Sequence, residues 1–193
     1  QYVPYSAKFI LHSALYCHDF TTYPRSSQNR SAVTINYNIF SWNPIMAALT
    51  ASCIDLNIQG NGAYSILKQL ATMALQNGFI TDSHQFLQTL LLREKMHSTG
   101  FGSGIAVPHG KSACVKQPFV LFARKAQAID WKASDGEDVN CWICLGVPQS
   151  GEEDQVKIIG TLCRKIIHQD FINQLRQGDA DEVLALLNQT LSS

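Results

Sequence analysis

Hydrophobic and polar positions follow a regular pattern from about residue 48 onward, and this pattern predicts most of the elements. Ile54, Leu56 and Ile58 alternate with polar residues, which is typical of a half-buried strand. Residues 64–76 then carry apolar side chains at three- and four-residue spacing and end at an Asn-Gly pair. That spacing predicts an amphipathic helix with a glycine stop.

A second helix is predicted from Ser83 to about Met96. Asp82 precedes it as an N-cap, and Gln85 stands at the third helical position, as in a capping box. Arg93 falls near the C-terminal end of this helix.

The rest of the chain mixes strands and helices. Strands are predicted at 118–125 and 138–148, with a turn at 134–138, and amphipathic helices at 152–169 and 179–189, where Asp179 and Glu182 form a second capping box. Helices and strands that alternate in this way favour an α/β fold in which helices cover a sheet.

Residues 1–45 lack this regularity. They hold nine of the 18 aromatic residues and only four charged ones, with no sustained period. Either they are an atypical extension of the domain at 46–193, or they are upstream sequence and Met46 is the true initiator. We favour the second interpretation, in which the extension is not native.

Charge and cysteine content exclude some functions. Lys+Arg and Asp+Glu are both 15, and no basic stripe is visible, which argues against a nucleic-acid partner. The six cysteines are scattered among apolar neighbours, as expected in a reducing cytoplasm. Without a run of about 18 apolar residues or a signal peptide, we expect a cytoplasmic protein with no direct membrane insertion.

Two motifs suggest a chemical role but are better explained as structural elements. Cys141 and Cys144 could form half of a metal site, but at this spacing in a strand they point to opposite faces, and no second pair completes four ligands. The link "GFGSG" lacks the Gly-Lys-Ser/Thr ending of a phosphate loop, and Ser103 lacks the flanking glycines of a nucleophile elbow. We therefore expect no metal and a flexible turn.

His109 differs from the other five histidines, which lie in the N-terminal segment or on helices. It follows the β-like "IAV", Pro108 restricts its approach and Gly110 leaves space beyond it, so we expect the ring at a sheet edge, facing solvent. A neutral imidazole is a nucleophile near pH 7 and can carry a phosphoryl group. Arg93 and Lys111 are the nearest cations, and the nearest hydroxyls are Ser98, Thr99 and Ser103.

The motif of an RE pair, then STG, then GIAVPHG, within "LLLREKMHSTGFGSGIAVPHGK", resembles the enzyme IIA domain of the mannitol/fructose class of the bacterial phosphoenolpyruvate-dependent sugar phosphotransferase system. The resemblance covers about residues 48–190. It implies an α/β fold with a central mixed sheet flanked by helices, and no cofactor. It also implies that His109 takes a phosphoryl group from the phosphohistidine of HPr and passes it to a cysteine of a IIB domain.

The resemblance assigns Arg93 to the arginine that contacts the phosphoryl group. Gln155 stands where sugar-specific members generally have a second active-site histidine, and Ser103 where some members have an acidic residue. Because Gln155 cannot become a cation, we expect slower or weaker transfer. Phe101 and Ile105 are expected to form an apolar docking patch beside His109.

Two alternatives to a sugar-transport phosphotransferase remain open. The first is a regulatory, nitrogen-type IIA protein whose phosphorylation state controls its binding to target proteins. The second is a phosphoryl-inactive binding module, which rests on Gln155 alone. The presence of both His109 and Arg93 argues against it.

Overall fold

The computed structural model describes residues 48–192, and all elements below lie within that range. The predicted domain boundary at residue 46 and the interpretation of residues 1–45 lie outside the described residues. Helices and strands are mixed along the chain, in the following order: the 3-10 helix η1 (Ala51–Cys53), β1 (Ile54–Asp55), α2 (Ala63–Gln76), α3 (Ser83–Met96), β2 (Gly100–Gly102), β3 (Ile105–Ala106), β4 (His109–Lys111), β5 (Phe119–Ile129), β6 (Val139–Val147), α4 (Glu152–Ile166), α5 (Gln169–Gln177) and α6 (Ala180–Leu191).

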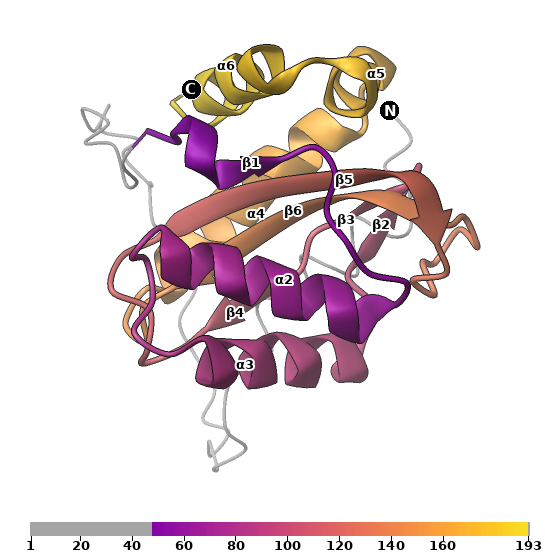
Figure 1. Ribbon diagram of the computed structural model, residues 1–193. Coiled ribbons are helices and arrows are strands. Elements are labelled where there is room, and N and C mark those ends of the chain that lie inside the picture. The colour runs from indigo at the N-terminus through magenta and orange to yellow at the C-terminus, as the bar shows by residue number, and fades with distance from the viewer. Residues whose placement is uncertain (1–47, 193) are drawn as a thin grey trace, which may run out of the picture.

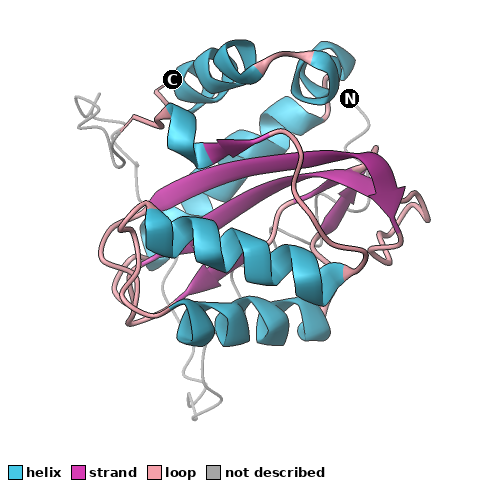
Figure 2. Ribbon diagram, in the orientation of Figure 1, coloured by secondary structure: helices cyan, strands magenta, loops and turns pink. Residues whose placement is uncertain are grey.

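A mixed sheet forms the central layer, with the order β1-β5-β6-β3-β2, and β4 also pairs with β6. β5 runs antiparallel to β6, whereas β3 and β4 run parallel to it. Helices α2 and α3 cover one face, and α4, α5 and α6 cover the other (Figures 1 and 2). The α/β fold with a central mixed sheet flanked by helices is therefore confirmed.

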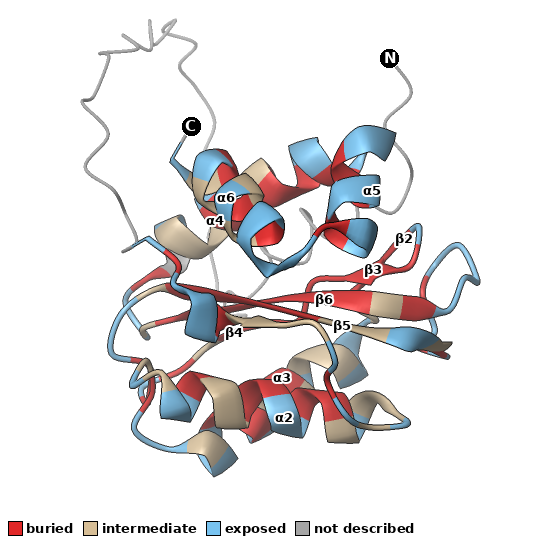
Figure 3. Ribbon diagram, turned by 45° about the horizontal axis from the view of Figure 1, so that its top comes forward, coloured by how far each residue is buried: buried red, intermediate tan, exposed pale blue. Residues whose placement is uncertain are grey.

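β6 is the centre of the hydrophobic core. Every residue from 141 to 147 is buried, because helices cover both faces of the sheet at this strand (Figure 3). Strands covered on both faces read as continuous apolar runs, as "CWICLGV" does. Phe119 of β5 continues the core toward the α3 face, where it packs against Phe86 with ring centroids 5.5 Å apart.

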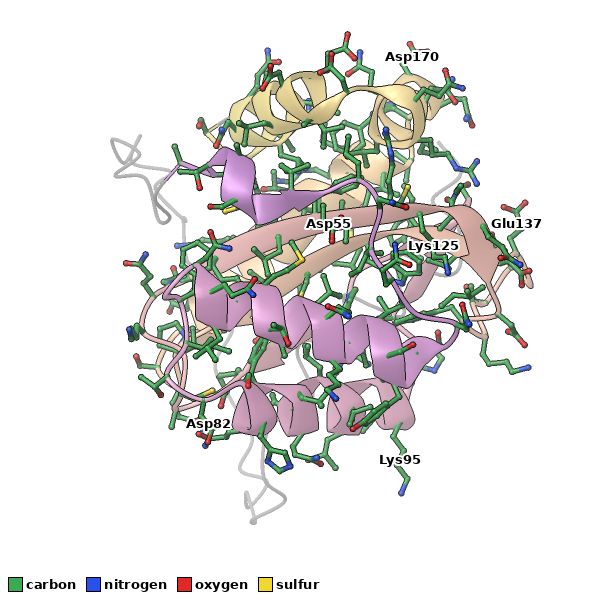
Figure 4. All side chains as sticks on the ribbon, in the orientation of Figure 1. Asp55, Asp82, Lys95, Lys125, Glu137 and Asp170 are labelled. Atoms are coloured by element: carbon green, nitrogen blue, oxygen red, sulfur yellow. The ribbon has the colours of Figure 1, made fainter. Side chains whose placement is uncertain are left out.

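The predicted helix starts are largely confirmed. The Asp82 carboxylate accepts hydrogen bonds from the backbone N–H groups of His84 and Gln85, so Asp82 is the N-cap of α3, although Gln85 contributes only its backbone. Asp179 and Glu182 form the complete capping box of α6, with both bonds at 2.9 Å. Figure 4 shows Asp82 at the start of α3.

Two predicted elements differ from the structure. The strand expected over Ile54–Ile58 is limited to two residues, because the Asp55 carboxylate accepts the Asn57 N–H at 2.9 Å and turns the chain. The helix expected at 152–169 is α4, which ends at Ile166, and a further helix, α5, follows after His168, which is extended with φ −97° and ψ 123°. Helix α5 was therefore missed.

Candidate functional site

β3 and β4 pair with the same side of β6 and form one strand with a two-residue interruption. Ile105 pairs with Cys141 and His109 pairs with Leu145, so β3 and β4 keep the same register on either side of Val107 and Pro108. Within the interruption, the Val107 N–H donates to the Thr99 carbonyl at 2.9 Å, and the Pro108 carbonyl accepts the Leu145 N–H at 3.0 Å. The interruption is therefore fixed from both sides, and it frees the Val107 carbonyl from the ladder.

Gly110 shows which face of the sheet His109 uses. A Cβ atom at Gly110 would lie 2.6 Å from Thr89 of α3, so only glycine allows this helix to lie so close. Because side chains alternate along a strand, the Cβ of His109 points away from Thr89, although its ring still reaches Arg93 of the same helix.

Both ring nitrogens of His109 have defined partners. Nδ1 lies 2.8 Å from the Val107 carbonyl, which can only accept, so Nδ1 carries the proton. Nε2 then accepts the Arg93 Nε–H at 3.0 Å, and Arg93 Nη1 donates to the His97 carbonyl at 2.7 Å. The lone pair of the ring therefore lies on Nε2, on the side of the guanidinium. α3 supplies the arginine and β4 the histidine.

The ring is buried, so the expectation that it faces solvent is wrong. His109 is 1% exposed because Arg93 and the Val107 carbonyl contact its two nitrogens and the sheet lies beneath it. Burial first and the Arg93 cation second lower the pKa of His109 from 6.5 to about 4, against the opposing effect of the Val107 bond. The imidazole is therefore neutral at pH 7, with its Nε2 lone pair in the bond from Arg93.

A half-buried carboxylate lies next to this pair in sequence, and sequence reasoning missed its role. Glu94 accepts the backbone N–H of Thr99 at 2.8 Å and also its hydroxyl. The Thr99 oxygen in turn accepts the indole N–H of Trp131 at 3.3 Å. Burial raises the pKa of Glu94, and the Thr99 hydrogen bonds partly oppose this shift. The signal was present in the "RE" pair and the "ST" that follows it.

The hydroxyls predicted near His109 are used elsewhere. Ser98 donates to the Trp131 carbonyl at 3.0 Å, and the Thr99 hydroxyl donates to Glu94. Ser103 is exposed at the tip of the β2–β3 turn, with φ 54°, and its N–H donates to Asp135 at 2.9 Å. Ile105, two residues after it, is already four strand positions from His109, roughly 13 Å. The structure therefore brings Ser103 together with Asp135 and not with His109.

Gln155 lies on α4 and Lys111 on β4. Gln155 is in the first turn of α4, partly exposed, and its backbone N–H donates to the Gly151 carbonyl at 3.0 Å. α4 follows β6 directly and packs against it. Lys111 is half-buried at the end of β4.

The expected docking patch is wrong. Phe101 is 5% exposed and Ile105 is fully buried, because β2 and β3 lie within the covered part of the sheet. Large exposed apolar side chains lie instead on α3, where Leu92 and Met96 are 63% and 70% exposed. They flank Arg93 in sequence and lie one helical turn apart on one face of the helix.

The two cysteines of "CWIC" are both buried in β6. Burial raises the pKa of the Cys141 thiol to about 11 and raises that of Cys144 further. Such thiols are inert hydrophobic groups rather than ligands or nucleophiles. In residues 48–192, no group of three or more His, Cys, Asp or Glu side chains is arranged to hold a metal ion.

The fold and the site together define an α/β domain with a buried, neutral histidine that an arginine contacts. The family model for the "phosphoenolpyruvate-dependent sugar phosphotransferase system, EIIA 2" matches residues 47–190, and the chain belongs to this family. In the part of the chain that the structure describes, no helix is long and apolar enough to cross a membrane.

Relatives of known identity agree with this assignment. The chain is 94% identical over 148 residues to the "PTS system fructose-like EIIA component" of Escherichia coli K12, covering 77% of this chain and 100% of the relative. A crystal structure of the nitrogen regulatory protein IIA-Ntr from Neisseria meningitidis is 27% identical, with a TM-score of 0.67, over 72% of this chain and 94% of that one.

A complex of enzyme IIA mannitol with phosphorylated enzyme IIB mannitol from Escherichia coli shares the fold. It is 22% identical with a TM-score of 0.63, over 72% of this chain and 96% of that one. The chain is thus an EIIA component of a sugar phosphotransferase system, that is, a phosphoryl-transfer component.

Proposed function

We propose that His109 Nε2 is the atom that carries the phosphoryl group, accepted from HPr and passed to a cysteine of a IIB protein during uptake of a fructose-like sugar. The observation that carries this proposal is the pair of ring contacts. They leave a neutral imidazole with its lone pair on Nε2, beside the guanidinium of Arg93. The sugar is inferred from the E. coli relative, whose name describes a fructose-like system.

The transfer balances with this tautomer. The N–P bond of the donor phosphohistidine breaks and leaves its electron pair on the donor nitrogen, while the lone pair of His109 Nε2 forms the new N–P bond. The proton of His109 stays on Nδ1, in its bond to the Val107 carbonyl. In the next step this N–P bond breaks and a thiolate sulfur of the IIB protein forms the S–P bond. The imidazole is a good leaving group because its Nδ1 remains protonated.

Arg93 has two roles in this scheme. Its Nε–H holds Nε2 before the reaction, so the incoming phosphoryl group displaces it. The bond from Nη1 to the His97 carbonyl keeps the guanidinium within reach, where it contacts the phosphoryl oxygens. Catalysis of phosphoryl transfer is largely positioning and electrostatic stabilisation of these oxygens.

Gln155 and the α3 surface complete the proposed site. Gln155 lies in the first turn of α4, which follows β6, and in this scheme its amide donates one neutral hydrogen bond to the phosphoryl group. The exposed Leu92 and Met96 beside Arg93 form the apolar part of a small, transient docking surface. Two sequential partners with transient contacts use such a surface in turn.

The test is phosphorylation of the purified protein. Incubation with phosphoenolpyruvate, enzyme I and HPr is expected to add one phosphoryl group by intact mass, labile in acid and absent in His109→Gln. His84→Gln, on the exposed face of α3, is the matched control and keeps the adduct. An adduct that persists in His109→Gln contradicts the assignment.

The regulatory alternative has support of its own, because the IIA-Ntr structure is 27% identical to this chain. It predicts the same adduct but no onward transfer to a IIB cysteine. Incubation of the phosphorylated protein with purified fructose-type IIB separates the two. Loss of the phosphoryl group to IIB supports transport, and its retention supports regulation.

A further inference from the structure

A chain of hydrogen bonds leads from Glu94 to the ring of His109. The Glu94 carboxylate holds both the N–H and the hydroxyl of Thr99. The Thr99 carbonyl accepts the Val107 N–H at 2.9 Å, and the Val107 carbonyl accepts Nδ1–H of His109 at 2.8 Å. Glu94 is thus connected to the ring through two backbone contacts, without touching it.

These contacts decide which ring nitrogen of His109 carries the proton. With the proton on Nε2 instead, the lone pair of Nδ1 would face the Val107 carbonyl oxygen and the Nε2–H would face the Arg93 Nε–H. Both contacts would be repulsive. The position of the Val107 carbonyl therefore selects the tautomer whose nucleophilic atom is Nε2.

Val107 lies in the two-residue interruption between β3 and β4, where the sheet ladder does not hold its carbonyl. Its position depends on the Thr99 carbonyl on one side and on the Leu145 N–H, which binds the next carbonyl, on the other. Thr99 is itself held from both ends, by Glu94 and by the Trp131 indole. The carboxylate is the group that fixes the 98–100 segment against the interruption.

Glu94 is half-buried, and a carboxylate that is partly out of water is unfavourable unless hydrogen bonds replace the lost hydration. Here the two bonds from Thr99 replace part of it. An acid with these two bonds to the residue next in the chain toward the histidine fits a role in positioning better than one in packing.

We propose that Glu94 is a positioning residue, which acts through Thr99 and Val107 to keep His109 in the Nδ1–H tautomer with Nε2 as the reacting atom. This inference rests on the proposed phosphoryl transfer for its effect on rate. Its structural part, the tautomer, is present before any phosphoryl group arrives.

The test compares Glu94→Gln with Glu137→Gln. A glutamine at 94 has the same shape, but it accepts only the Thr99 N–H and must donate its NH2 to the Thr99 hydroxyl, so neutral bonds replace the two charge-assisted ones. Glu137 carries the same charge on the exposed loop between β5 and β6 (Figure 4), so its change controls for the loss of one carboxylate. The ring-nitrogen NMR resonances of labelled, unphosphorylated protein report the tautomer directly.

In the parent protein and in Glu137→Gln we expect a protonated Nδ1 and an unprotonated Nε2. In Glu94→Gln the two resonances should move toward each other as the second tautomer becomes populated, and the rate of phosphorylation should fall roughly ten-fold. A slower rate with unchanged resonances would show a merely structural role and overturn the inference. Unchanged rate and resonances would overturn it as well.

A second pair keeps the test decisive if Glu94→Gln does not fold. Thr99→Val removes the hydroxyl that links Glu94 and Trp131, whereas Thr99→Ser keeps it. We expect Thr99→Val to shift the ring resonances and Thr99→Ser to restore the parent pattern. If both variants keep that pattern, the relay is wrong. Because these spectra need no phosphoryl donor, failure of phosphorylation in the parent protein would refute the proposed function without affecting this result.

Discussion

β6 has two very different neighbours. On one side β5 pairs with it without interruption from Phe119 to Arg124. On the other side the pairing partner is broken at Val107 and Pro108 and resumes at His109. The continuous side has apolar residues packed between two helical layers, and the broken side has the buried polar groups Thr99 and His109. The comparison indicates that the pairing of β6 with β5 stabilises the fold, whereas the side toward β3 and β4 holds the candidate functional residues.

The largest effect on stability is expected from a core substitution in β5, on the continuous side of β6. Leu121→Ala removes a fully buried side chain opposite Cys144 and should lower the free energy of unfolding by about 2–5 kcal/mol. Urea unfolding measures it, with the exposed Gln127→Ala on the same strand as the control, expected within about 0.5 kcal/mol. Phosphorylation per folded molecule should not change. A large loss of that rate would show that the two sides are not separate.

The buried His109, on the broken side of β6, should make the free energy of unfolding depend on pH. His109 titrates at about 4 when folded and near 6.5 when unfolded, so the unfolded chain binds more protons between these values. The stability from the neutral ring is complete above pH 6.5 and is lost as the pH falls toward 4, by up to about 3 kcal/mol.

Urea unfolding of the parent and of His109→Gln, at about pH 7 and about pH 4.5, isolates this contribution. The parent should lose more stability than the variant on acidification. The raised pKa of Glu94 acts in the opposite direction but is common to both proteins. Equal losses in the two proteins would mean that the ring is not held neutral.

A smaller, purely chemical effect is expected from Arg93→Lys. Lysine keeps the charge but cannot contact His109 and the His97 carbonyl with a rigid fork. The rate of phosphorylation should fall roughly 10- to 100-fold, with little change in unfolding free energy. Arg164→Lys, exposed on α4, is the control. An unchanged rate in Arg93→Lys would remove the guanidinium from the mechanism.

The smallest effect concerns Gln155→His. A histidine at the start of α4 can carry a charge and strengthen one bond to the phosphoryl group, so we expect a gain in transfer rate of about two- to ten-fold. Rapid-quench measurement of the phosphorylated protein checks this, with Gln177→His at the exposed end of α5 as the control. If the rate does not rise, glutamine is not the weak point of the site.

The sequence pattern predicted the long, regular elements well, and the short or interrupted ones less well. Apolar spacing predicted α2, α3, β5 and β6, since each has a long, periodic run. The end of β1 depends on the Asp55 side chain and the start of α5 on the extended backbone of His168, and the apolar period registers neither. The family motif pointed to His109 and Arg93, and the structure brings them into contact.

The rest of the site could not be predicted from the sequence because it depends on distant contacts. Whether His109, Phe101 or Ile105 is exposed is decided by the elements that pack over them, not by their neighbours in sequence. The relay from Glu94 combines three backbone or side-chain bonds across segments 94–109, and Trp131 joins it from beyond β5. No local period links these positions.

The outer edge of the sheet at β5 has a further consequence. Its partner β1 is only two residues long, and the Ile58 N–H donates to the Arg124 carbonyl at 3.0 Å, so the open part of the strand begins at Lys125. Arg124 and Lys125 stand where this cover ends, and each donates to a helix or loop carbonyl, of Leu175 and of Gly60 respectively. Positive charges at an edge disfavour the addition of a strand from another molecule. They act as gatekeepers that disfavour aggregation through the open end of β5.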